Sequence, residues 1–276
     1  MSGQASPAGR LSALSDGAAR LSLAEGLEQG LMMAETANGR GWPRTAGRSQ
    51  EILSTFTRYV AERGYDGTNF SDIANELGIS KGTIVHHYGT KDRLLAALHE
   101  SYMRRRLAEA RLIVERLDGP VEQLAGLLHA FIRYQVHDRD ATVAFQREVI
   151  RLADPVFAGA GRQLRADYLQ LFRDVISAGI HSGSFRPVEV PVTSLLIFGG
   201  SQWAWTWFRP DGREPVEQVA AVFVDYVLGS LLVRRDALPR LADPHGPVAG
   251  VAKQCLADCA HVSPDANQAT RSAAGK

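Results

Sequence analysis

The stretch that decides the fold covers residues 68–91 and reads TNFSDIANELGISKGTIVHHYGTK. Asn69 is a residue type that caps helix N-termini, and Gly78 can take the left-handed conformation that ends a helix. Ser80 can then cap a second helix in which Ile84 is a buried position. Two short helices joined by such a tight turn form a helix-turn-helix.

The second of these helices begins with a cation and a hydroxyl and has no acid in its first turn. A helix N-terminus also carries free N–H groups and a partial positive charge, which suit a phosphate. We expect five residues to meet base edges in a DNA major groove, namely Lys81, Gly82, Thr83, Val85 and His86. We expect six more to meet phosphates, namely Thr68, Asn69, Ser80, His87, Tyr88 and Lys91. On an isolated helix such residues more often form only a solvated face, but the whole two-helix pattern favours DNA.

Residues 79–95, ISKGTIVHHYGTKDRLL, resemble the signature of the tetracycline-repressor (TetR) family of transcription regulators. In that family such a run forms the recognition helix and the start of the next helix. The resemblance implies double-stranded DNA as a partner. The sequence departs from the family at Val85, where a tyrosine is frequent, so one aromatic DNA contact is missing.

Composition limits the other classes of function. The chain has 276 residues and a net charge of 31 − 30 = +1, so DNA binding must depend on where its charges lie. Cys255, Cys259 and His261 are too few for a closed zinc site, and we expect no metal and no cofactor. The role of the two cysteines stays open. Sparse cysteine fits a reducing cytoplasm, where we expect the protein to be. The sequence shows no apolar run of ~18 residues and no secretory signal, so we expect no helix that spans a membrane.

Enzyme motifs are missing from the sequence. It has no G-x-S-x-G, no glycine-rich phosphate loop, no H-E-x-x-H and no spaced carboxylate pair. We therefore expect that the protein is not an enzyme, and we keep an enzyme as the least favoured alternative.

The pattern predicts an all-α fold in four parts. Residues 1–47 form a disordered or weakly helical arm, 48–93 a three-helix helix-turn-helix domain, 94–233 a helical ligand-binding and dimerisation domain, and 234–276 a flexible tail. The arm carries Arg40, Arg44 and Arg48, which can reach a minor groove or phosphates. A floppy extension with ordinary arginines is an equal alternative.

Apolar spacing predicts long helices over 90–117, 121–137, 140–153, 156–182, 191–208 and 214–233. The first of them ties the DNA-reading head to the rest of the chain. We expect its arginine run, residues 104–106, to be a solvated face or one salt-bridged to Glu100, Glu109 and Glu115.

The last two helices are apolar on more than one face. Such helices are buried on one side in their own core and on another side against a partner, which predicts a homodimer through a four-helix bundle. The expected interface residues are Leu195, Phe198, Gly199, Val222, Phe223 and Tyr226. A larger monomeric core is the alternative.

Aromatic residues and an arginine of the second domain predict a ligand pocket, with plain core as the alternative for each one. They are Phe131, Phe145, Arg147, Phe157, Tyr168, Phe172, Trp203 and Trp207. Residues 202–212, QWAWTWFRPDG, are similar to TetR-family repressors of fatty-acid and steroid breakdown, several of which respond to acyl-CoA thioesters. The resemblance implies a repressor that binds a palindromic operator as a homodimer and is released by a small lipophilic effector, with acyl-CoA as one candidate. A sensor needs a cavity of ~300–1,000 Å³, whereas a regulator without a small ligand does not.

Overall fold

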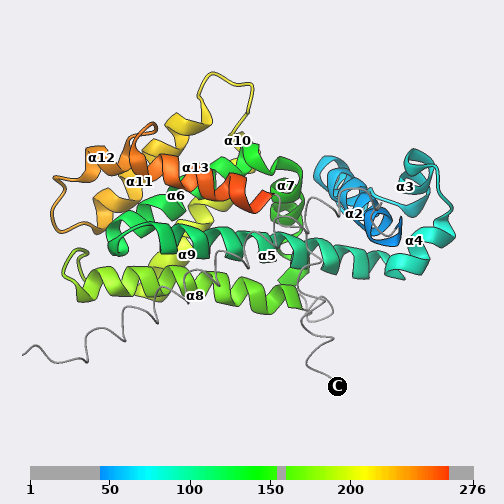
Figure 1. Ribbon diagram of the computed structural model, residues 1–276, viewed down its shortest axis with the longest axis horizontal. Coiled ribbons are helices and arrows are strands. Elements are labelled where there is room, and N and C mark those ends of the chain that lie inside the picture. Colours follow the sequence, from blue (N-terminus) through cyan, green and yellow to red (C-terminus); the bar gives the residue numbers. More distant parts are fainter. Residues whose placement is uncertain (1–43, 154–159, 261–276) are drawn as a thin grey trace, which may run out of the picture. The chain divides into compact units, whose positions relative to one another are not determined.

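The computed structural model describes residues 44–153 and 160–260 (Figure 1). The described residues contain helices and one isolated β-bridge, between Phe185 and Leu232, but no strand. The all-α expectation is therefore confirmed. The described residues from Glu51 onward form one compact unit.

The first three helices are α2 (Arg44–Arg63), α3 (Phe70–Leu77) and α4 (Lys81–Tyr88). Their ends follow the expected caps. The Asn69 side chain accepts hydrogen bonds from two backbone N–H groups of α3, and Gly78 has φ +61°. The side chain of Ser80 accepts from the Thr83 N–H at 3.1 Å. Fully buried isoleucines of α3 and α4 join the apolar face of α2 in the core, which fixes the two short helices against the longer one.

Helix α2 starts at Arg44, four residues before the expected start of the domain at residue 48. Arg44 and Arg48 are therefore residues of α2, and their expected contacts with a minor groove or phosphates stay predictions. Arg40, with the rest of the expected arm up to residue 43, lies outside the described residues. Apolar spacing missed the extra turn because residues 44–48 contribute no apolar side chain to the pattern.

The remaining helices form the larger part of the unit. They are α5 (Lys91–Arg116), α6 (Gly119–His137), α7 (Arg139–Glu148), the 3₁₀ turn η2 (Arg151–Ala153), α8 (Ala160–His181), α9 (Val190–Gln202), α10 (Ala204–Trp207), α11 (Val216–Leu231), α12 (Leu238–Ala242) and α13 (Pro247–Ala260). Helix α5 lies along α8, and α6 packs against α11, α13 and α8. Thr90 caps α5 by accepting from the Arg93 N–H.

A glycine permits the close approach of α6 to the end of α5. A Cβ atom at Gly126 would lie 2.5 Å from Leu117 Cδ1 and 2.9 Å from Ile113 Cγ2. Both distances are shorter than van der Waals contact, so only a residue without a side chain fits at this crossing.

The expected flexible tail is wrong for residues 238–260, which form α12 and α13. Helix α13 packs against α6 and α5, and Cys255 and Leu256 are buried there. Arg116 of α5 forms an ion pair with Asp258 at 2.6 Å. The glycines and prolines of the segment disfavour a helix while its alanines favour one, and tertiary packing supplies much of its stability.

Among the described helices, none is both long and apolar enough to cross a membrane.

Candidate functional site

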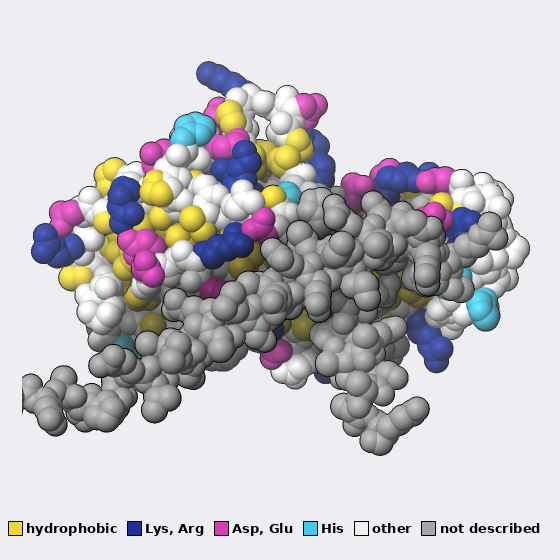
Figure 2. Space-filling view, in the orientation of Figure 1, with side chains coloured by type: hydrophobic (Ala, Val, Ile, Leu, Met, Phe, Trp, Pro, Cys, Tyr) yellow, Lys and Arg dark blue, Asp and Glu magenta, His cyan; other side chains and the backbone are white. Residues whose placement is uncertain are grey.

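The N-terminal end of α4 is exposed. Lys81, Gly82 and His86 are exposed, and the side chain of Val85 is 49% exposed, whereas Ile84 faces the core. Figure 2 shows Lys or Arg and His side chains on the surface around α4. The first turn contains no acid, so no carboxylate in it compensates the partial positive charge of the helix N-terminus. Four of the five expected base-reading residues are thus accessible to a partner.

Thr83 is half-buried, and its hydroxyl lies 3.0 Å from that of Ser80. The two hydroxyls sit at the free N–H groups of α4, where a phosphate would be held. Asn69 and Ser80 are exposed, and His87 and Tyr88 are half-buried. Their contacts with phosphate stay predictions.

Two of the expected phosphate contacts lie differently. Thr68 is only 2% exposed, and its hydroxyl donates to the Gly64 carbonyl at 2.9 Å, so its expected contact with phosphate is wrong. The hydroxyl serves the turn after α2 instead. Lys91 is half-buried with its ammonium 4.1 Å from the centre of the Tyr65 ring, and burial lowers its pKa.

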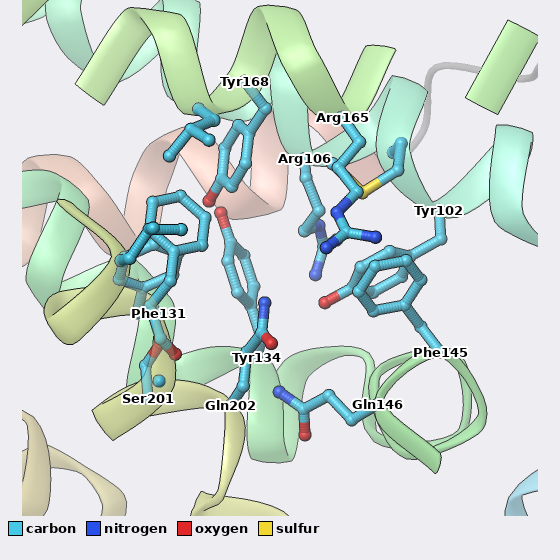
Figure 3. Close-up of a pocket in the computed structure, with 15 residues that line it drawn as sticks. Tyr102, Arg106, Phe131, Tyr134, Phe145, Gln146, Arg165, Tyr168, Ser201 and Gln202 are labelled. Atoms are coloured by element: carbon cyan, nitrogen blue, oxygen red, sulfur yellow. The ribbon is translucent and has the colours of Figure 1, made fainter. Parts of the chain in front are cut away.

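A cavity of about 190 Å³ lies among α5, α6, α7, α8 and α9 (Figure 3). It is smaller than the ~300–1,000 Å³ expected for a sensor. Its lining comprises Tyr102, Met103, Arg106, Phe131, Tyr134, Phe145, Gln146, Arg165, Tyr168, Leu169, Leu195, Phe198, Gly199, Ser201 and Gln202.

Three of the expected pocket residues, Phe131, Phe145 and Tyr168, line this cavity. The others do not. Phe172 is fully buried and stacks on Phe131 with ring centres 4.7 Å apart, so it is core. Trp203 and Trp207 are 66% and 55% exposed and Arg147 contacts α2, while Phe157 lies outside the described residues.

The expected dimer residues divide between two surroundings. Phe198 is half-buried and packs edge-on against three aromatic rings of the interior, and its expected place in an interface stays a prediction. Phe223 is half-buried, with its ring 3.4 Å from the Cβ position of Gly200. The remaining four, Leu195, Gly199, Val222 and Tyr226, are exposed in the single chain, although Leu195 and Gly199 also border the cavity.

A buried ion-pair cluster forms one wall of the cavity. Arg106 is 1% exposed and pairs with Glu109 at 2.9 Å and Asp138 at 3.2 Å. Its guanidinium lies 3.8 Å from the centre of the Tyr134 ring. Burial raises the pKa of the Glu109 carboxyl, while the charge of Arg106 opposes that rise. Arg106 is therefore not solvated, while its expected salt bridge with Glu109 is confirmed, as is that of Arg104 with Glu100.

Arg165 and His99 lie beside this cluster. Among the residues that the structure describes, no carboxylate lies within ion-pair distance of Arg165, which is half-buried, and burial lowers its pKa. His99 is 1% exposed, and within the same described ranges neither ring nitrogen has a hydrogen-bond partner. Burial, and then the charge of Arg165, lower the pKa of His99 to about 4, so its ring is neutral at pH 7.

Sequence reasoning missed the polar half of the lining. Tyr102, Arg106 and Glu109 follow one another at i, i+4 and i+7 on the buried face of α5. That spacing was visible in the sequence and could have placed Arg106 inside. No such signal marked Gln146 or Gln202, because an isolated glutamine does not indicate which way its helix faces.

Helix α7 contacts the cavity and the helix-turn-helix domain through consecutive residues. Phe145 and Gln146 line the cavity. The next residue, Arg147, donates to the backbone carbonyls of Ala61 and Glu62 at 2.9 and 3.3 Å. Glu148 then accepts from the Tyr65 N–H at 2.9 Å. A change at the cavity can therefore reach the end of α2 through one turn of helix.

Comparison with known families agrees with this geometry. Residues 52–98 match the family described as bacterial regulatory proteins, tetR family, and residues 117–231 match the tetracyclin repressor-like C-terminal domain. The chain belongs to the TetR family of transcription regulators. This membership makes it a DNA-binding regulator rather than an enzyme.

Among curated TetR-family relatives, the HTH-type transcriptional repressor KstR2 of Mycobacterium tuberculosis is 29% identical over 185 residues, which are 67% of this chain and 92% of the relative. The HTH-type transcriptional regulator HbdR of an Aromatoleum species is 30% identical over 171 residues, 58% of this chain and 68% of the relative.

Solved structures of the TetR family give the same fold. The ketosteroid regulator KstR2 of M. tuberculosis has a TM-score of 0.61 at 29% identity, covering 68% of this chain and 96% of that one. AibR in complex with isovaleryl coenzyme A and operator DNA has a TM-score of 0.59 at 26% identity, covering 67% and 98%.

Proposed function

We propose that this TetR-family regulator is a cytoplasmic repressor that binds a palindromic operator as a homodimer and is released by a small lipophilic effector, with short acyl-CoA thioesters as the leading class. The observation that carries the proposal is the exposed tip of α4. Its side chains there are cationic, small or apolar, and its N-terminal turn has no acid. This is the surface that a major groove accepts.

The cavity supports the effector half of the proposal. It combines aromatic walls with arginines, and AibR, which has a similar fold, is known in complex with isovaleryl coenzyme A and operator DNA. An effector that binds more tightly to one spacing of the dimer's two helix-turn-helix domains shifts the population toward that spacing. A coupling of ~1–3 kcal/mol would weaken operator binding ~5–150-fold, with α5 and α7 as the connecting helices.

A second candidate is a DNA-binding regulator without a small ligand. The specific observation that favours it is the size of the cavity, about 190 Å³. Addition of short acyl-CoA thioesters separates the two. A sensor releases its operator and melts higher, whereas a regulator of the second kind does neither.

Lys81 tests the DNA half. Binding fragments are first selected from random duplexes at low salt, and affinity is then measured for the parent and for Lys81→Ala. A contact to a base edge is worth ~1–3 kcal/mol, so the variant should bind its selected site roughly 5–150-fold more weakly and discriminate less at one position. A contact to phosphate would instead weaken all sequences alike and lower the salt slope by ~1.

Lys253→Ala is the matched control, because Lys253 is an exposed lysine of α13, outside the helix-turn-helix domain. It should bind like the parent. The DNA-reading role of α4 is refuted if Lys81→Ala and Lys253→Ala have the same affinity and salt slope.

A further inference from the structure

The lining of the cavity combines aromatic and apolar side chains with polar ones. The hydroxyls of Tyr134 and Tyr168 point toward one another in it, and the side chains of Gln146, Gln202 and Ser201 also line it (Figure 3). Two of these groups have partners within the protein, since Gln146 accepts from Gln135 Nε2 at 3.3 Å and the Ser201 hydroxyl donates to the Phe198 carbonyl at 3.0 Å. The charged side chains of the lining are therefore the groups that a ligand has to match.

The charges beside the cavity do not cancel. Arg106 is matched by Glu109 and Asp138, and the same Asp138 carboxylate also pairs with Arg105 at 2.8 Å. In the described ranges, Arg105 and Arg106 are thus matched by the two carboxylates of Glu109 and Asp138, and Arg165 has no carboxylate partner. Figure 3 shows the side chains of Arg106 and Arg165 both directed into the cavity.

Arg165 is a cation without a counter-ion in a partly desolvated place. The nearby ring of His99 is buried and neutral, so it adds no charge beside Arg165. An unpaired charge that has lost water is costly, and an anion brought into contact with it recovers that cost. The planar guanidinium suits a carboxylate, which it can bind with two parallel hydrogen bonds.

We propose that the part of the effector held in this cavity carries a carboxylate that pairs with Arg165. The ligand class is then a short carboxylic acid anion, present either as the free acid or as the far end of a dicarboxylic acid whose other carboxyl is a thioester. The volume of about 190 Å³ limits the buried part to a short chain. This inference rests on the proposed effector cavity.

Two pairs of probes of equal chain length test it by thermal shift and calorimetry. The affinity of hexanoate should exceed that of hexanamide at least about tenfold, and the affinity of adipoyl-CoA should exceed that of hexanoyl-CoA by a similar factor. The reason is that only the first of each pair brings a carboxylate to a cation. The first preference alone indicates a free acid as the source, and the second indicates a dicarboxylic thioester.

Variants of one helix supply the controls. Arg165→Gln should abolish both preferences without lowering the melting temperature, because it removes an unpaired cation. Arg165→Lys should restore part of them. Arg162→Gln, an exposed arginine three residues earlier on α8, should keep both.

The possible failures are distinct. Preferences that survive in Arg165→Gln, or binding of hexanoyl-CoA alone, overturn the carboxylate inference and leave the proposed sensor intact. If none of the four probes binds, both the inference and the effector half of the proposed function fall, while the DNA half stands.

Discussion

At the scale of single residues, His99 shows how burial sets a charge state. The ring lies inside, against Phe145, with its centre 5.5 Å from that of the phenyl ring. Gly161 leaves it room, because a Cβ atom there would come within 2.8 Å of His99 Nδ1. A protonated imidazole would be desolvated in this place beside Arg165. The fold therefore admits the neutral ring and opposes the charged one.

This arrangement predicts a loss of stability in mild acid. An ordinary histidine titrates near 6.5, whereas burial lowers the pKa of His99 to about 4. Between these values the unfolded chain binds more protons than the folded one, so the free energy of unfolding falls as pH drops from 6.5 to 4. The contribution of His99 to this fall is at most about 3 kcal/mol. Denaturant unfolding at a series of pH values measures it.

His99→Gln should flatten the fall in this window. His245→Gln, which changes an exposed histidine, should leave it as in the parent. Equal slopes in the parent and in His99→Gln would show that His99 is not the titrating group.

Arg106 marks a limit of prediction from sequence at this scale. Its charge favoured a solvated position, and its spacing from Tyr102 favoured a buried one. The structure follows the spacing, because Glu109 and Asp138 compensate the charge inside. Asp138 comes from the end of α6, so this compensation depends on a contact between segments distant in the sequence, which the local pattern does not contain.

At the scale of helices, the capped turns from Asn69 to Thr90 were predictable because each signal lies within a few residues of the group it satisfies. Helices α12 and α13 were missed for the opposite reason. Their alanines favour a helix and their glycines and prolines disfavour one, so the local signals conflict, and burial of Val248, Ala252 and Cys255 against other helices fixes the segment. The cavity shares this dependence, since its lining comes from five helices.

Helix α7 gives the prediction that belongs to this scale. Arg147→Ala removes two hydrogen bonds from α7 to the end of α2, while Phe145 and Gln146 stay at the cavity. Each bond is worth ~1 kcal/mol, so the coupling of effector to DNA should fall by up to ~1–2 kcal/mol, or roughly 5–30-fold. Operator affinity with and without hexanoyl-CoA and adipoyl-CoA measures this coupling.

Arg139→Ala is the matched change on the same helix, because Arg139, the first residue of α7, donates to the Gln135 carbonyl of α6 at 3.4 Å. The effectors should release the operator from this variant as fully as from the parent. If the effectors release the operator from Arg147→Ala as they do from the parent, α7 does not couple the cavity to the DNA-binding domain, and α5 is left as the connection.

At the scale of the whole molecule, the single chain leaves an apolar surface uncovered. We call it the α9–α11 face; it comprises Val192, Leu195, Leu196, Trp203, Trp207, Val222 and Tyr226, each more than half exposed. The α9 members Val192, Leu195 and Leu196 recur at i, i+3 and i+4, which is one side of a helix, and Trp203 is the residue directly after that helix. A contiguous apolar surface of this kind marks an interaction site. A second copy of the chain would cover it with the same residues around a two-fold axis.

Leu196→Asp tests this dimer, because the side chain is 72% exposed in the single chain and would be buried between two copies. Two carboxylates facing each other across an apolar interface are costly, so the variant should sediment with half the parental mass at micromolar concentration. Its operator affinity should fall as well, since a palindrome needs two heads ~34–36 Å apart. Ile150→Asp is the control, with an 87% exposed side chain outside the α9–α11 face. If Leu196→Asp keeps the mass and operator affinity of the parent, the dimer is formed by another surface.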